Sequence, residues 1–112
     1  MKVYNAEEII VRQGEKGESM YYVLAGKVGV YINYGTPEEK KLAELNEQQF
    51  FGEMSLLNNE VRSATVIALE DDTCVQQIDR DNFVEFCTEH PEKVFAIMQQ
   101  LSSRLREANG IR

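Results

Sequence analysis

The fold of this chain is decided around the stretch Phe51-Gly52-Glu53-Met54-Ser55-Leu56-Leu57, which is followed by Arg62-Ser63-Ala64-Thr65-Val66. Strand-like alternation stops at Gly52, and a short helix is predicted to begin near Glu53. Free N–H groups at the start of a helix attract anions. Arg62 lies nine positions after Glu53, and its planar guanidinium suits phosphate oxygens. The stretch therefore predicts a small anion-binding site.

The carboxylate of Glu53 would repel an anion unless it faces a hydroxyl group, as carboxylates do when they hold a ribose. Alternatively, Glu53 and Arg62 form a surface ion pair of little energetic value. Gly52 either lets a ligand approach the backbone or is an ordinary glycine between a strand and a turn. The hydroxyl of Ser63 caps the backbone or contacts the ligand.

The residues on either side of this stretch predict short strands. Apolar or alternating runs, cut by Gly, Pro, Asn and Asp, are typical of a β-sandwich, roll or barrel. Gly14 and Gly17 are expected to supply positive φ angles in a tight turn. The Ala25-Gly26-Lys27 connection predicts a β-hairpin between the second and third strands. The expected strands are 9–12, 20–24, 28–33, 42–45, 64–69 and 73–78.

After Ile78 the apolar residues recur at the spacing of a helix instead of alternating as in a strand. Asp79 or Asp81 is expected to cap a first helix, and Pro91 suits the first turn of a second one. On the second helix, apolar residues at spacings of 4, 3, 4 and 3 form a seam that is expected to be part core and part interface: Val94, Met98, Leu101, Leu105 and Ala108. Gly110 is expected to end this helix.

Composition limits the possible functions. The 112 residues carry a net charge of −7, which excludes a generic nucleic-acid or anionic-membrane binder and still permits one small anion at a local positive site. Cys74 and Cys87 lack metal-ligand spacing, and the single His90 is too few for a metal-dependent β-roll enzyme. Without a signal peptide or membrane span in this segment, the expected setting is cytoplasmic.

The quoted stretch closely resembles the phosphate-binding cassette of cyclic nucleotide-binding domains, a family that includes the catabolite activator and the regulatory subunits of cyclic-AMP-dependent protein kinase. The resemblance covers about Val3 to Asn109 and includes the glycines Gly14, Gly17 and Gly26. It implies one domain over residues 1–112 that is mainly β. An eight-stranded, jelly-roll-like β-roll (a double-stranded β-helix) would occupy about 9–79, with a short internal cassette helix, and C-terminal helices would follow over about 80–109.

The resemblance also implies roles for single residues. Arg62 would pair with the cyclic phosphate and Glu53 with the ribose 2′-hydroxyl, while backbone groups of Gly52, Glu53, Met54 and Ser55 complete the cradle. Further ligand neighbours would be Leu42, Ala43, Leu45, Ser63, Ala64 and Val66, with Arg104, Ala108 and Asn109 in a lid. Ala108 has no hydroxyl to read an adenine edge, and from the residues alone Arg104 is more often a solvated helix residue than a base contact.

The function expected from this resemblance is a regulatory sensor without enzymatic activity. It would bind cyclic AMP in preference to cyclic GMP, use no metal, and transmit binding through its last helix, which is also a possible homodimer contact. No DNA or membrane contact is expected of this segment. The alternative is a protein-interaction module that keeps the fold without the ligand and works through the Val94–Ala108 seam.

Overall fold

The computed structural model describes residues 1–109, with side chains through Glu107. Eight strands form two antiparallel four-stranded sheets, in the orders β1-β8-β3-β6 and β2-β7-β4-β5. The strands are β1 (Lys2–Tyr4), β2 (Ile9–Val11), β3 (Ser19–Ala25), β4 (Val28–Ile32), β5 (Lys40–Leu45), β6 (Phe50–Phe51), β7 (Thr65–Ala68) and β8 (Thr73–Asp79). The expected mainly β, eight-stranded roll is confirmed, and its two sheets do not close into a barrel.

Two strands were not expected from the sequence. β1 and β6 have only three and two residues, which is too short for alternation to show. β1 pairs with β8, so that Val3 lies opposite Cys74, and β6 pairs with β3. The roll therefore begins at Lys2, before the expected start at Ile9.

The expected hairpin between β3 and β4 is wrong. β3 pairs with β8 and β6, whereas β4 pairs with β5 and β7 in the other sheet. Gly26, at φ +85°, carries the chain from one sheet to the other, and a β-carbon there would lie 2.6 Å from Oγ1 of Thr73. Because the connection is packed against β8 at this corner, a tight turn here changes sheets instead of pairing neighbouring strands.

The buried side chains form two clusters. Between the sheets, Val23, Val28 and Val75 are fully buried. Under the helices, Met20 and Phe50 pack in a second cluster, which is completed by Tyr22, Leu56, Ile78, Phe86 and Ile97. The second cluster fastens the helical segment to the strands, because it takes residues from both.

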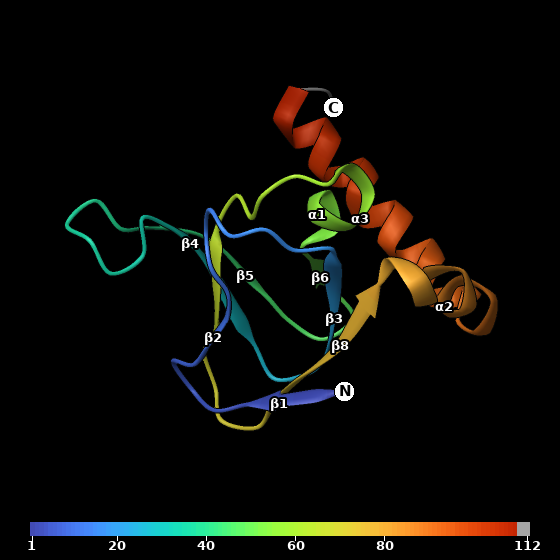
Figure 1. The fold of residues 1–112 in the computed structure, drawn as a ribbon, viewed down its shortest axis with the longest axis horizontal. Helices are drawn as coiled ribbons and strands as arrows, with labels where there is room; N and C mark the ends of the chain where they lie inside the picture. Colours follow the sequence, from blue (N-terminus) through green and yellow to red (C-terminus); the bar gives the residue numbers. More distant parts are fainter. Residues whose placement is uncertain (110–112) are drawn as a thin grey trace.

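Helix α1 (Glu53–Asn58) lies inside the strand order, and η1 (Arg80–Asn82), α2 (Phe83–Glu89) and α3 (Pro91–Asn109) follow β8. In Figure 1, the helices gather on the side of the strands opposite the projecting β4–β5 loop. Asp79 precedes η1, and its N–H donates to Oδ1 of Asn82 at 2.8 Å. None of the helices within the described residues has the length and apolar character needed to cross a membrane.

The apolar seam of α3 is divided between core and surface. Val94 and Leu101 pack against the second cluster, whereas Met98 and Leu105 are 61% and 63% exposed. The side chain of Ala108 and the expected stop at Gly110 lie outside the described part of the chain.

Candidate functional site

A cavity of about 540 Å³ lies between the β2-β7-β4-β5 sheet, α1 and α3. Its volume is in the range of small-molecule sites. The sheet contributes an apolar wall, formed by Val11, Val30, Ala43, Leu45 and Val66. The opposite wall is polar and comes from the cassette and from α3. A ligand here would meet apolar side chains on one side and charged ones on the other.

The cassette begins where the chain leaves β6. Gly52 has φ +83° and precedes α1, and the N–H of Ser55 donates to the carbonyl of Gly52 at 3.2 Å. Ser55 is 2% exposed, and its hydroxyl donates to the carbonyl of Glu60 at 2.8 Å. This hydroxyl therefore fixes the turn after α1, while the backbone from Gly52 to Ser55 borders the cavity.

Arg62 is the buried charge of the site. It is 7% exposed, and its Nη1 donates to the carbonyl of Ser19 at 2.7 Å and to that of Gly52 at 3.4 Å. Its guanidinium carbon lies 5.7 Å from the centroid of the Tyr21 ring. Within residues 1–107, no carboxylate forms an ion pair with it. The alternative interpretation of Arg62 and Glu53, a surface ion pair between them, is therefore wrong.

Burial lowers the pKa of Arg62, and the Coulombic contribution of the Tyr21 phenol opposes this shift. Guanidinium groups nevertheless stay protonated in proteins, because their ordinary pKa is very high. The site thus holds a desolvated positive charge that is satisfied by neutral carbonyl groups. Such a charge gains more from an anion than an exposed arginine does.

Two glycines make room for this arginine. A β-carbon at Gly17 would lie 2.4 Å from Nη2 of Arg62, and one at Gly52 would lie 2.8 Å from Nη1. Gly14 has the expected positive φ, +86°, whereas Gly17 does not belong to the positive-φ glycines. The expectation about φ is therefore wrong for Gly17, where glycine is required for space.

Glu53 pairs with Arg104 of α3. Nη1 of Arg104 lies 3.0 Å from Oε1 of Glu53, and its Nη2 donates to the carbonyl of Phe50 at 2.7 Å. The guanidinium carbon also lies 4.5 Å from the centroid of the Phe50 ring. Arg104 thus joins the last helix to the start of the cassette, which is a more specific position than that of a solvated helix residue.

Most of the expected ligand neighbours border the cavity: Ala43, Leu45, Gly52, Glu53, Met54, Ser55, Arg62, Ser63, Ala64, Val66 and Arg104. Leu42 does not, and it is 51% exposed. The reason is the alternation of β5, which puts Ala43 and Leu45 on the inner face and Leu42 on the outer one. Leu42 therefore does not share the cavity with the other expected ligand neighbours. The side chain of Asn109 lies outside the described ones.

Several lining residues were missed from the sequence, above all Gln100, Ser103 and Glu107 of α3. Together with Arg104 they lie on one face of the helix, because their positions follow helical spacing. The expected lid role of Arg104 could therefore have indicated this whole face. The others are Val11, Val30, Gln49, Phe51 and Val61. They come from separate strands and loops, which only the folded chain brings together.

Comparison with known proteins gives the same family from sequence and from structure. The family model of the cyclic nucleotide-binding domain matches residues 1–90. The chain is 33% identical over 108 residues to a cyclic AMP receptor protein of Thermus thermophilus, covering 96% of this chain and 50% of that protein. It is 34% identical over 107 residues to a cGMP-dependent protein kinase of Caenorhabditis elegans, covering 93% of this chain and 14% of the kinase.

Solved structures agree with these matches. The crystal structure of the Thermus thermophilus catabolite activator protein superposes with a TM-score of 0.79 and 32% identity, over 96% of this chain and 50% of that one. The cAMP-bound form of the EAL enzyme Bd1971 gives a TM-score of 0.67 and 32% identity, over 96% of this chain and 28% of the enzyme chain. The chain thus spans about half the length of its Thermus relative. It belongs to the cyclic nucleotide-binding domain family.

Proposed function

We propose that residues 1–112 form one regulatory domain that binds a 3′,5′-cyclic mononucleotide in the cavity beneath α3. The observation that carries this proposal is the guanidinium of Arg62, which is 7% exposed and borders the cavity. Within residues 1–107 it donates to two carbonyl groups, lies against an aromatic ring and forms no ion pair. A cyclic phosphate supplies the single negative charge that this position lacks.

The rest of the ligand would extend along the two walls. Glu53 would accept a hydrogen bond from the ribose 2′-hydroxyl, and the base would lie against Ala43, Leu45 and Val66. Ser63, which is exposed and borders the cavity, would contact the phosphate. Cyclic AMP is proposed in preference to cyclic GMP. Support comes from the relatives at 33% and 32% identity, which are a cyclic AMP receptor protein and the cAMP-bound form of an EAL enzyme.

Binding would act through α3. Arg104 connects this helix to Glu53. A ribose that binds Glu53 would therefore also change the contact between Glu53 and Arg104, which holds α3 to the cassette. A ligand shifts such an equilibrium only by its differential affinity for the two arrangements, typically about 1–3 kcal/mol. The proposed role is therefore regulatory, with no catalytic residues, no metal cofactor and no DNA or membrane contact by this segment. The proposed setting is cytoplasmic.

Calorimetric titration of the purified domain with cyclic AMP, cyclic GMP and cyclic di-GMP tests the proposal. A mononucleotide should bind, and Arg62→Leu should weaken binding by about 2–5 kcal/mol, because the buried phosphate loses its charged partner. Thermal unfolding gives a second measure, since a ligand at 100 times its Kd adds about 2.7 kcal/mol of stability. Equal affinity of Arg62→Leu and the parent would refute the assignment of the site.

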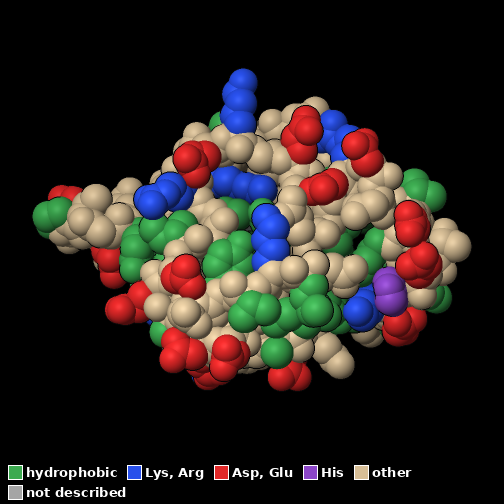
Figure 2. Space-filling view, turned by 60° about the horizontal axis from the view of Figure 1, so that its bottom comes forward, with side chains coloured by type: hydrophobic (Ala, Val, Ile, Leu, Met, Phe, Trp, Pro, Cys, Tyr) green, Lys and Arg blue, Asp and Glu red, His purple; other side chains and the backbone are tan. Residues whose placement is uncertain are grey.

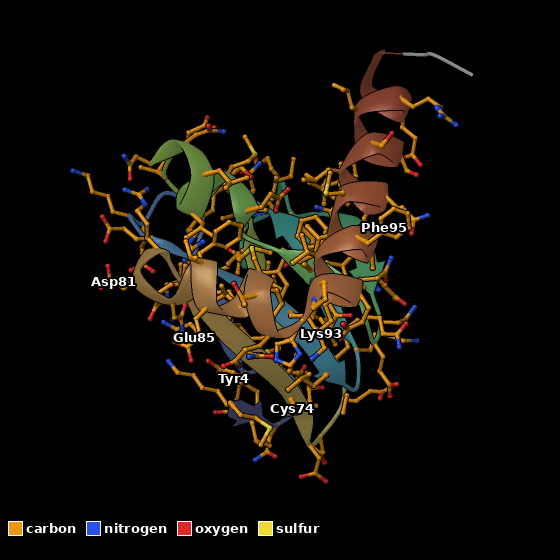
Figure 3. All side chains as sticks on the ribbon, turned by 90° about the vertical axis from the view of Figure 1, so that its right-hand side faces the viewer. Tyr4, Cys74, Asp81, Glu85, Lys93 and Phe95 are labelled. Carbon is orange, nitrogen blue, oxygen red and sulfur yellow. The ribbon has the colours of Figure 1, made fainter. Side chains whose placement is uncertain are left out.

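A second candidate function rests on the outer face of α3. Phe95, Met98 and Leu105 are 62%, 61% and 63% exposed, and Figure 3 shows Phe95 on the side of the helix that points away from the strands. An exposed apolar stripe of this kind marks a protein contact, and we propose a second copy of the chain as its partner. Sedimentation of the parent and of Met98→Glu tests the dimer, and the thermal shift with cyclic nucleotides distinguishes the two candidates. A ligand-free interaction module would lose its dimer in the variant and show no thermal shift with any cyclic nucleotide.

A further inference from the structure

Arg80 connects the turn after the last strand with the far end of the cassette helix. Its Nη2 donates to the carbonyl of Leu56 at 2.8 Å and its Nε to the same oxygen at 3.3 Å. Nη2 also donates to Oδ1 of Asn59. Arg80 lies 24 positions after Leu56 and 21 after Asn59 in the chain. One guanidinium thus bridges η1 and the end of α1.

The end of α1 needs an external partner. Carbonyl groups in the last turn of a helix have no intrahelical N–H donor, and cationic groups stabilise them. The last turn of α1 contains no basic residue, and Asn59 ends the helix in the left-handed conformation at φ +57°. A helix of six residues is also too short to be stable by itself. Arg80 supplies the missing cation from another element.

The turn that carries Arg80 is anchored to the roll beside the phosphate site. The carboxylate of Asp79 accepts hydrogen bonds from Oγ of Ser19 and from Nε2 of Gln77, the latter at 2.9 Å. The carbonyl of the same Ser19 accepts from Arg62. Arg80 therefore extends from a turn that is hydrogen-bonded to the roll, and its contact with α1 involves no residue of α3.

The two ends of α1 are consequently held by different arginines. Arg104 holds the first residue, Glu53, from α3, whereas Arg80 holds the last turn from η1. The contact made by Arg104 lies at the cavity, because Arg104 and Glu53 both line it. The contact made by Arg80 lies outside the cavity, since Leu56, Asn59 and Arg80 do not line it.

We propose that Arg80 is a positioning residue, which fixes the last turn of α1 so that the cassette is already arranged for the ligand before binding. The proposal rests on the proposed binding of a cyclic nucleotide. A protein whose binding-competent arrangement is only partly populated binds with an affinity reduced by that fraction. Loss of Arg80 should therefore weaken binding although this side chain touches no ligand.

The test compares Arg80→Ala, Arg80→Lys and Asn59→Ala with the parent, and with Arg106→Ala as a matched control. Arg106 is an exposed arginine of α3 and does not border the cavity. Three quantities are measured: the Kd for cyclic AMP and cyclic GMP, the midpoint of thermal unfolding without ligand, and hydrogen exchange of the backbone amides of residues 54–60.

Arg80→Ala should raise the Kd about three- to tenfold, as expected for charge-assisted hydrogen bonds made by an exposed side chain. Exchange should accelerate in residues 54–60, while the unfolding midpoint changes no more than in Arg106→Ala. Arg80→Lys keeps the positive charge but loses the planar guanidinium with its several donors, so its affinity should lie between those of Arg80→Ala and the parent. Asn59→Ala should have a smaller effect, and in the double variant with Arg80→Ala the two effects should not add.

Two outcomes would overturn the proposal: an unchanged Kd in Arg80→Ala, or a weaker affinity that is accompanied by equal loss of thermal stability and uniformly faster exchange. Should Arg80→Ala not fold, Arg80→Lys and Asn59→Ala give the same comparison. If the parent binds neither nucleotide, the proposed function fails, and hydrogen exchange alone decides about Arg80. Selective acceleration in residues 54–60 then supports its holding role, and uniform acceleration refutes it.

Discussion

The guanidinium of Arg62 occupies the space beside Gly17 that any other residue there would need for its side chain. A β-carbon at Gly17 would lie 2.4 Å from Nη2, 2.7 Å from the guanidinium carbon and 2.7 Å from Nε. Real β-carbons do not approach other atoms this closely. The position of the buried cation therefore depends on a loop more than forty residues before it in the chain.

Gly17→Ala should displace Arg62 and weaken cyclic nucleotide binding by about tenfold or more, because the buried charge leaves its place above the cavity. Calorimetry of the variant measures this. Gly35→Ala is the matched control, since Gly35 has φ +82° and open space around it. The control should lose some stability through backbone strain and keep the parent's affinity. Equal affinity of Gly17→Ala and the parent would contradict the prediction.

Glu53→Gln should weaken binding of a ribose cyclic nucleotide by about tenfold, since a neutral amide accepts a hydrogen bond less strongly than a carboxylate. It should hardly change binding of the 2′-deoxy form, which lacks the hydroxyl. Titration of both ligands into both proteins gives the four affinities required. Equal losses for the two ligands would remove the ribose role from Glu53.

Arg104→Ala should destabilise the domain by about 1–2 kcal/mol, because it removes hydrogen bonds to Glu53 and to the Phe50 carbonyl and a cation–π contact with the Phe50 ring. Urea unfolding of the ligand-free protein measures the change. Arg106→Ala, on the exposed side of the same helix, should lie within about 0.5 kcal/mol of the parent. An equal effect of both variants would show that Arg104 contributes only as a helix residue.

Asp79 should make the stability sensitive to acid. Hydrogen bonds from Ser19 and then from Gln77 lower the pKa of its carboxyl below the ordinary value of 3.8. The unfolded chain therefore binds the proton first as the pH falls. The stabilisation is fully present above pH 3.8 and is lost as the pH falls through the folded-state pKa.

Thermal unfolding of the parent and of Asp79→Asn between about pH 7 and pH 3 measures this dependence. The midpoints of the two proteins should differ at neutral pH and converge in acid, where the parent carboxylate becomes protonated. Asp81→Asn is the control, because Asp81 is exposed at the outer edge of η1 (Figure 3). A constant difference between the parent and Asp79→Asn across the range would contradict the assigned cause.

In the folded domain, the acidic composition bears on ligands of the outer surface and not on the buried site at Arg62. Figure 2 shows acidic side chains spread around one face of the molecule, with basic ones between them. The buried cation at Arg62 is set apart from this surface, since it is 7% exposed. The net charge of −7 therefore opposes polyanions at the surface, and it leaves room for the proposed local recognition of one small anion.

Much of the cassette could be predicted from its own residues. Gly52, Glu53 and Arg62 were identified because a glycine, a short helix and a returning arginine are local features of the sequence. The helix from Pro91 was predicted for the same reason, since a proline at the first turn and the helical period are both local signals. The partners of these residues were not predictable in this way. Ser19 and Gly17 approach Arg62 from over forty positions away, and nothing in their own surroundings indicates that contact.

The types of element and the residues that can hold an anion follow from local sequence, because backbone propensity and side-chain chemistry act over short distances along the chain. Three features appear only in the folded chain: the sheet that each strand joins, the outward face of Leu42, and the hold of Arg104 and Arg80 on opposite ends of α1. These relationships depend on the register of strands and the packing of distant segments. They lower the free energy only when the whole chain is folded, so no single segment of the sequence encodes them.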